Sequence, residues 1–174
     1  MSPGLQNPVR ARHLAAALVL AVAAGSALAD DYADVARLLR AGQSAEALAR
    51  ADRYLAASPR DPQMRFLKGV ALGDAGRSAE ALEVLTRLVE EYPELPEPHN
   101  NLAVLHAARG DLDKARSALE AALRVNPSYA TAHENLGDVY LGLAARAWER
   151  AQQLEPGLAR SVAPKLAAAR SLAR

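Results

Sequence analysis

Residues 100–127, NNLAVLHAARGDLDKARSALEAALRVNP, decide the fold of this chain. Apolar residues recur at helical spacing from Leu102 until Gly110-Asp111 interrupts the pattern. They recur again from Leu112 until Asn126-Pro127 ends the run. The stretch therefore predicts two amphipathic helices joined by a tight turn. Because such a hairpin cannot bury its apolar face alone, we expect it to be one unit of a repeat.

The punctuation of this unit recurs at a fixed interval along the chain. A turn glycine, an alanine early in the second helix and a closing proline each return after 34 positions. These three series are Gly42, Gly76 and Gly110, then Ala47, Ala81 and Ala115, and Pro59, Pro93 and Pro127. The period predicts an all-α solenoid of stacked helix hairpins, with about three full repeats.

Several positions repeat in phase with a known pattern. In the last full unit these are Asn101-Leu102, Gly110, Ala115, Leu119, Ala122 and Pro127, and in the unit before it Gly69, Gly76, Ala81, Leu85 and Pro93. On these residues the sequence resembles the tetratricopeptide repeat family over about residues 31–156. The resemblance implies an α-solenoid that binds other proteins. One departure is that His99 and His133 stand where the family has a tryptophan near the start of a unit.

The N-terminal residues differ in composition from the rest of the chain. Arg10 and Arg12 precede an apolar run over residues 14–24, and Ala27-Leu28-Ala29 follows it. A basic segment, an apolar segment and an A-x-A site are typical of a secretory signal peptide. We therefore expect a signal over residues 1–29, cut after Ala29, and a periplasmic or secreted product. A retained membrane anchor is the less favoured alternative, because a span needs about 20 apolar residues.

Charge and cysteine content restrict the partners of the exported chain. Residues 1–29 contain two arginines and no acids, so 21 basic and 20 acidic residues become 19 and 20 after cleavage. A nearly neutral protein is not expected to bind nucleic acid, nor to insert in a membrane once the signal is cut. The absence of cysteine excludes disulfides and thiol chemistry, so helix stacking must stabilise the domain at 30–174.

The last repeat departs from the period. We expect units at about 30–61, 62–95 and 96–129, but the interval from Pro127 to Pro156 is five positions shorter than the interval between the earlier prolines. The missing residues are those of the turn in a shortened unit at 130–157. An unbroken apolar stripe then predicts one helix from about Ala132 to Leu154. A capping helix should follow at 158–172, where Pro164 is tolerable only near the first turn. This end resembles that of small exported bacterial repeat proteins.

No catalytic or metal-binding pattern stands out. His99, His106 and His133 lack the spacing of a metal motif, so we interpret them as packing or surface residues. Glu134 and Asp138 are one helical turn apart, which is more typical of a solvated face than of paired catalytic acids. We therefore expect no catalytic residues, no cofactor and no metal, and a non-enzymatic role.

The remaining candidate is the concave surface of the solenoid. In the family that the chain resembles, the first helix of each unit lines this surface. That implies partner-binding positions at Tyr32, Phe66, Val70, Glu97, Asn100, Val104, Glu134 and Asp138. The family's clamp for a C-terminal carboxylate is absent, because Val70 and Val104 occupy its asparagine positions and no lysine lines the groove. An open alternative is that a neighbouring helix covers Phe66 and Val70.

The charges and rings of these positions indicate the polarity of a ligand. Tyr32 and Phe66 are one repeat apart, so we expect their rings to form an aromatic anchor, and Glu97, Glu134 and Asp138 should make the far end acidic. The segment bound there should be apolar at one end and basic at the other.

Two functions from different classes fit this sequence. One is a periplasmic scaffold or adaptor that binds a peptide or protein segment in the groove. The other is an oligomeric structural subunit of a cell-envelope assembly, with the C-terminal long helix as its interface, so a homo-oligomer is possible. A role as an accessory to cell-wall or polysaccharide enzymes rests on family association alone.

Overall fold

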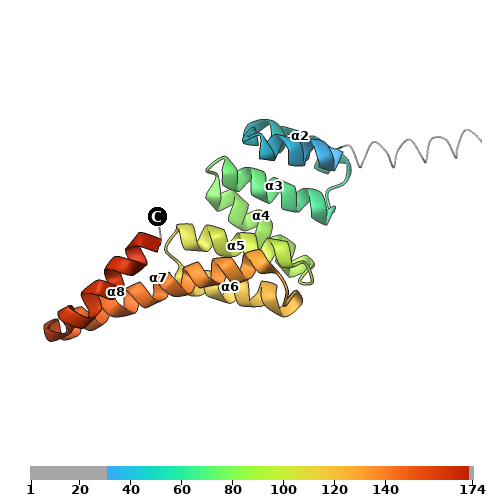
Figure 1. Cartoon of the computed structure of the whole chain (residues 1–174). Coiled ribbons are helices and arrows are strands. Elements are labelled where there is room, and N and C mark those ends of the chain that lie inside the picture. Colours follow the sequence, from blue (N-terminus) through green and yellow to red (C-terminus); the bar gives the residue numbers. More distant parts are fainter. Residues whose placement is uncertain (1–30, 173–174) are drawn as a thin grey trace, which may run out of the picture.

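The computed structural model describes residues 31–172, which contain helices and no strand (Figure 1). Residues 31–40 are helical, and they are followed by α2 (Ser44–Ala57), α3 (Pro62–Asp74), α4 (Ser78–Glu91), α5 (Pro96–Ala108), α6 (Leu112–Val125), α7 (Ala130–Leu154), the 3-10 helix η1 (Pro156–Leu158) and α8 (Ala159–Leu172). The predicted all-α array of helix hairpins is confirmed. The expected signal peptide at 1–29 lies outside the described residues.

A glycine in the left-handed conformation ends the first helix of each full unit. Gly42, Gly76 and Gly110 have φ values of 70°, 75° and 76°. In each turn the amide after the glycine bonds back five residues, as Arg77 N does to Leu72 O at 2.9 Å. This C-terminal turn satisfies the last carbonyls of the helix. It requires a positive φ, which residues other than glycine adopt only at a cost in free energy. The regular recurrence of glycine is therefore a recurrence of helix ends.

An apolar core runs along the whole stack. Its first cluster joins the helix at 31–40 with α2, α3 and the start of α4, and its last joins α5, α6 and α7. A middle cluster lies between α4 and α5, and Leu105 and Ala118 link it to the clusters on either side. The largest fully buried side chains are Val35, Met64, Leu72, Leu85, Leu88, Leu119 and Pro98. Helices contact mainly their neighbours in the chain, as expected of a solenoid.

The helix α7 is continuous over its 25 residues from Ala130 to Leu154. The prediction of one helix from about Ala132 to Leu154 is therefore confirmed. Gly142 does not break this helix, and it lies where α7 crosses Leu112, whose Cδ1 would be 2.9 Å from an added Cβ. None of the helices within residues 31–172 combines the length and the apolar content needed to cross a membrane.

The far half of α7 extends past the α5–α6 pair, and α8 folds back along it (Figure 1). We call residues 144–172 the C-terminal arm. Val162, Leu166 and Ala169 of α8 are buried, although α8 contacts only α7 and η1 among the described elements. Lys165 Nζ lies 5.9 Å from the ring centroid of Trp148, at the distance of a cation–π contact. The arm thus has a small apolar core of its own.

Pro164 lies inside α8, as the sixth residue of the helix. The expectation that it would stand near the first turn is therefore wrong. Proline has no N–H, so the carbonyl of Arg160 loses its usual partner four residues on. Arg160 and Pro164 both lie on the exposed side of α8, where water can satisfy a carbonyl that lacks its helical partner.

Candidate partner-binding groove

Two cavities lie between the first helices of successive units. The first slot, between α3 and α5, has a volume of about 230 Å³, and the second slot, between α5 and α7, about 200 Å³. Gly69, Val70, Gly73, Asp74, Ser78, Leu85, Asn101, Val104, Leu105 and Ala108 line the first slot. Ala103, Val104, Ala107, Leu112, Leu119, Asn135, Asp138 and Val139 line the second.

The two slots are the same feature in consecutive repeats. Val70, Gly73 and Leu85 of the first slot stand one full repeat before Val104, Ala107 and Leu119 of the second. Val104 lines both slots and keeps 48% of its surface exposed. We call the surface formed by the two slots the groove. The two slots are mainly apolar and share Val104, and Val70, Val104 and Asp138 are the predicted residues that line them.

Small residues make room for the groove, and the sequence patterns did not single out most of them. Gly69 allows α4 to approach closely, because a Cβ there would lie 2.6 Å from Leu85 Cδ2. Ala103 takes the equivalent place one repeat later and is also buried. Gly73 and Ala107 repeat in the same way along the floor of the slots. The signal that could have identified them is a small residue that recurs once per repeat on the first helix.

The charged groups that line the slots are acidic. Asp74 and Asp138 are exposed, and neither slot contains a lysine or arginine in its lining. Glu134 stands one turn before Asp138 on α7, and Glu97 stands in the first turn of α5, both exposed. Within residues 31–172 none of these four carboxylates has an ion-pair partner. The groove therefore favours a cationic ligand.

Phe66 and Glu97 line a third cavity, of about 470 Å³, beside the N-terminal ends of α3 and α5. Pro62, Gln63, Leu95 and Pro98 complete its lining. Phe66 also packs against the middle core cluster, so its ring is partly covered by neighbouring helices. Phe66 is half-buried. Part of its ring is covered by neighbouring helices, and part of it lines the cavity.

Tyr32 is engaged within the chain. Its ring centroid lies 5.4 Å from that of Tyr54, and its hydroxyl donates to Asp61 Oδ2 at 2.6 Å. Burial raises the pKa of Tyr32, and the hydrogen bonds to Asp61 and Tyr54 raise it further. Tyr32 and Phe66 pack in different clusters, so the predicted aromatic anchor of these two rings is wrong. The reason is that Asp61, which caps α3 through Met64 N at 2.8 Å, attracts the hydroxyl of Tyr32 toward α2 and α3.

Asn100 is also engaged within the chain. It is only 5% exposed, and its Oδ1 accepts a hydrogen bond from Asn135 Nδ2 at 2.8 Å. This bond ties α5 to α7 beneath the second slot. Asn100 takes the repeat position of Phe66, and its shorter side chain leaves room for the amide of Asn135. We therefore interpret Asn100 as a support of the groove and not as a contact surface.

The three histidines of the described residues have two kinds of environment. His99 Nε2 lies 3.2 Å from Pro93 O and His133 Nε2 lies 2.9 Å from Pro127 O, so both tie a helix start to the preceding linker. Nδ1 of His106 is buried without a hydrogen-bond partner, and desolvation lowers its pKa, with a further contribution from Lys114. In the part of the chain that the structure describes, no three His, Cys, Asp or Glu side chains are placed to hold a metal ion.

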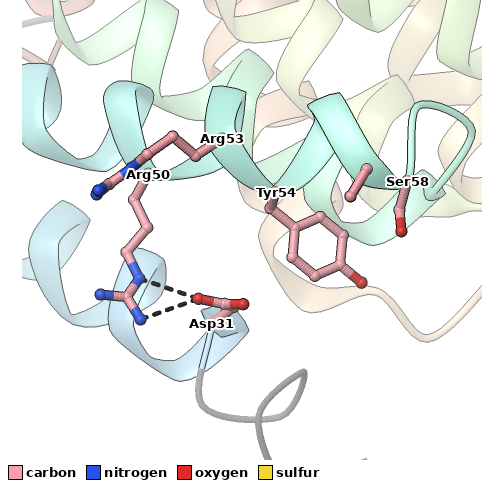
Figure 2. A pocket seen from close by; sticks show the side chains of 6 residues that line it. Asp31, Arg50, Arg53, Tyr54 and Ser58 are labelled. Atoms are coloured by element: carbon pink, nitrogen blue, oxygen red, sulfur yellow. Dashed lines mark hydrogen bonds and ion pairs between the residues drawn. The ribbon is translucent and has the colours of Figure 1, made fainter. Parts of the chain in front are cut away.

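A further cavity, of about 410 Å³, lies at the other end of the stack (Figure 2). Arg50 reaches across it to Asp31, with Nε and Nη2 at 3.1 Å and 2.9 Å from Oδ1, and pairs with Asp34 at 2.8 Å. Arg53 and Tyr54 line the same cavity. The sequence patterns did not reveal it, because Asp31 and Arg50 come from two helices and neither recurs one repeat later, where Arg65 and Val84 stand. Arg50 is neutralised by Asp31 and Asp34, whereas Arg53 has no ion-pair partner within residues 31–172.

Comparisons with known proteins agree with this architecture. Two family models described as tetratricopeptide repeat match residues 32–96 and 72–136. The probable biofilm formation methyltransferase WspC of Pseudomonas putida is 36% identical over 92 residues, which cover 53% of this chain and 22% of that protein. The chain thus spans about a fifth of the length of this relative.

Solved structures show the same fold. A thermophilic tetratricopeptide protein of Thermus thermophilus, TTC0263, has a TM-score of 0.62 and 26% identity, over 80% of this chain and 79% of that one. The first such domain of Spaghetti (RPAP3), solved with the HSP90 peptide SRMEEVD, has a TM-score of 0.61 and 18% identity, over 66% of this chain and 90% of that one. With helix hairpins, turn glycines and family matches in register, the chain belongs to the tetratricopeptide repeat family.

Proposed function

We propose that this chain is a non-enzymatic adaptor of the bacterial periplasm, which binds a peptide or protein segment in its groove. The observation that carries the proposal is the pair of equivalent apolar slots joined at the exposed Val104. Neighbouring slots with one period offer successive sites for the side chains of a single segment. Tetratricopeptide domains bind peptide and protein partners, and the RPAP3 domain was solved with a peptide.

The chemistry of the groove defines the kind of segment. Its slots accept aliphatic side chains, and Asp74 and Asp138 at their rims attract lysine or arginine. The peptide SRMEEVD of the RPAP3 structure ends in acidic residues, whereas the lining here has no cation to receive them. We therefore infer a ligand with apolar residues next to basic ones.

The periplasmic location is supported by the composition of residues 1–29, with its basic, apolar and A-x-A segments. We propose that α7 derives from a repeat that lost its turn, which the five missing residues support.

Intact-mass measurement of the exported protein tests the periplasmic location. A product that begins at Asp30 supports export, and a product that retains residues 1–29 and resists alkaline extraction from membranes refutes a soluble periplasmic form.

Site-specific photo-crosslinking tests the groove itself. A photoreactive residue at Val104 should give discrete adducts in cells, and one at Val125 should not, because Val125 is 40% exposed on α6 but lines neither slot. Adducts at Val104 should decrease when Asp138→Lys reverses the charge at the rim. Equal adducts at both valines would show that the groove has no preference for a partner and would refute the proposal.

A further inference from the structure

We propose that the groove also accepts the C-terminal arm of a second copy of this chain, so that copies link head to tail. The inference rests on the groove proposed above and adds an occupant for it. Three observations carry it: the charges of groove and arm, the exposed leucines at the tip of the arm, and the distance between the two within one molecule.

The groove is acidic, whereas the arm has a net positive charge, because residues 144–172 contain five basic residues and two acids, Glu149 and Glu155. Asp74, Glu97, Glu134 and Asp138 are the exposed carboxylates in and beside the groove. The helix α8 contains Arg160, Lys165 and Arg170 and no acid. Of these, only Arg170 has an ion-pair partner within residues 31–172, Glu149 at 3.2 Å. Free carboxylates on one surface and free cations on another favour an encounter between two copies.

The tip of the arm exposes two leucines, with one acid, Glu155, between them and an arginine on either side. Leu154 ends α7 with 68% of its surface exposed, and Leu158 in η1 is 36% exposed. Arg150 precedes Leu154 by four residues and Arg160 follows Leu158 by two. A dry cavity of about 150 Å³ holds a molecule of the size of benzene, so slots of about 200 and 230 Å³ can each hold one leucine side chain. The tip therefore has the chemistry inferred above for a groove ligand.

The arm cannot fill the groove of its own molecule. Asp138 in the second slot and Leu154 at the tip lie on one continuous helix, more than four turns apart. At 1.5 Å of rise per residue they are separated by about 24 Å along its axis. The tip must therefore enter another copy, whose own tip remains free. Such a heterologous contact leaves open ends and builds chains of molecules in place of closed dimers.

Sedimentation of the full chain, combined with two kinds of variant, tests the inference. The groove variant is Val104→Arg, and the tip variant combines Leu154→Glu with Leu158→Glu. All three positions are exposed, so these variants should fold, and circular dichroism checks that they do. The matched controls are Val125→Arg on α6 and Leu172→Glu at the end of α8, which are 40% and 73% exposed. Asp138→Lys serves as a second groove variant.

The average mass of the wild-type protein and of both controls should rise with concentration. Each variant alone should stay monomeric. An equimolar mixture of groove variant and tip variant should form a species of two chains and nothing longer, because one intact groove meets one intact tip. That complementation is specific to a head-to-tail contact.

Two results would overturn the inference. One is a wild-type protein that stays monomeric up to about 1 mM, the concentration at which binding is worth only about 4 kcal/mol. The other is a groove variant that associates like the wild type, which would place the interface between two arms. In either case, adducts at Val104 that Asp138→Lys removes would still support the groove as a partner site. Adducts at Val104 that contain only a second copy of this chain, with self-association intact, would instead refute the adaptor role alone.

Discussion

Tyr32, Phe66 and Asn100 occupy one repeat position in three successive units, yet their side chains do different things. Tyr32 donates a hydrogen bond to Asp61, Phe66 lines a cavity, and Asn100 accepts a bond from Asn135. The repeat pattern fixes where such a residue stands on the first helix. What it contacts depends on a neighbour that has no periodic signal, and this is why the predicted aromatic anchor failed while the helix positions were right.

His106 occupies a core position that is Leu72 one repeat earlier, and it should weaken the fold in acid. Its folded-state pKa is lowered, chiefly by desolvation, so the native state favours the neutral ring. As pH falls below about 6.5, the unfolded chain binds a proton first and stability is lost until the folded pKa is passed. Lys114 and Arg109 lower this pKa and Asp111 raises it.

We therefore predict that His106→Leu raises the free energy of unfolding by about 1 kcal/mol at pH 7.5, because it removes an unpartnered buried nitrogen. The gain should be larger at pH 5.5. Urea unfolding at the two pH values measures both. Leu72→His is the converse control and should introduce an acid-dependent loss. An equal effect of His106→Leu at both pH values would contradict the role of the ring's titration.

Replacement of three glycines by alanine should have different effects on the free energy of unfolding. Gly76→Ala should destabilise by about 1–2 kcal/mol, since φ is 75° and only the backbone is strained, with no atom within 4 Å of the new Cβ. Gly137→Ala should stabilise by about 1 kcal/mol, because Gly137 lies inside α7 with open space around it. Gly69→Ala should destabilise through its clash with Leu85. Urea midpoints rank the three, and a stabilising Gly76→Ala would exclude strain at the turn.

Among the elements, α7 was predicted only in part from the sequence. Its continuity followed from five missing residues and an apolar stripe. Its protrusion beyond α6 did not, because a stripe states that a face is buried and does not state which helix covers it. Here the partner is α8, whose internal proline lies on the exposed side of the helix.

The arm should open independently of the stack. Leu166→Ala removes a buried side chain from the arm's small core, and we predict a loss of about 2–3 kcal/mol in the local stability of α8 and the far half of α7. Hydrogen exchange should accelerate there and remain unchanged in α3 to α6. Leu88→Ala, at a fully buried position of α4, is the control and should accelerate exchange in the stack. Acceleration throughout the chain by both variants would indicate a single cooperative unit.

For the whole molecule, the repeat period predicted the helix order and the turns, and the resemblance to the family implied the face that contains Val70, Val104 and Asp138. The slots themselves could not be predicted, because their shape depends on small residues such as Gly73 and Ala107 between helices. Nor could the separation of charge between groove and arm, which appears only when α8 is placed along α7.

That separation predicts a dependence of self-association on salt. The Debye length falls from about 10 Å at 0.1 M to about 3 Å at 1 M, so higher salt should weaken the contact of a basic arm with an acidic groove. The weight-average mass at fixed concentration should then decrease. In the double variant Glu134→Lys, Asp138→Lys, association should be weak and should no longer decrease with salt. Association that strengthens with salt in the wild type would point to a purely apolar contact.

The position of Trp148, which packs against Lys165 in the arm, allows the arm to be followed by fluorescence. Trp148 is the only tryptophan of the chain and belongs to the arm, whereas Tyr32 and Tyr54 belong to the first repeat. Emission excited at the red edge of the indole band therefore comes from the arm alone, and tyrosine emission reports on the stack. Seating of the arm in another copy, or its release, should shift the indole spectrum without any attached dye.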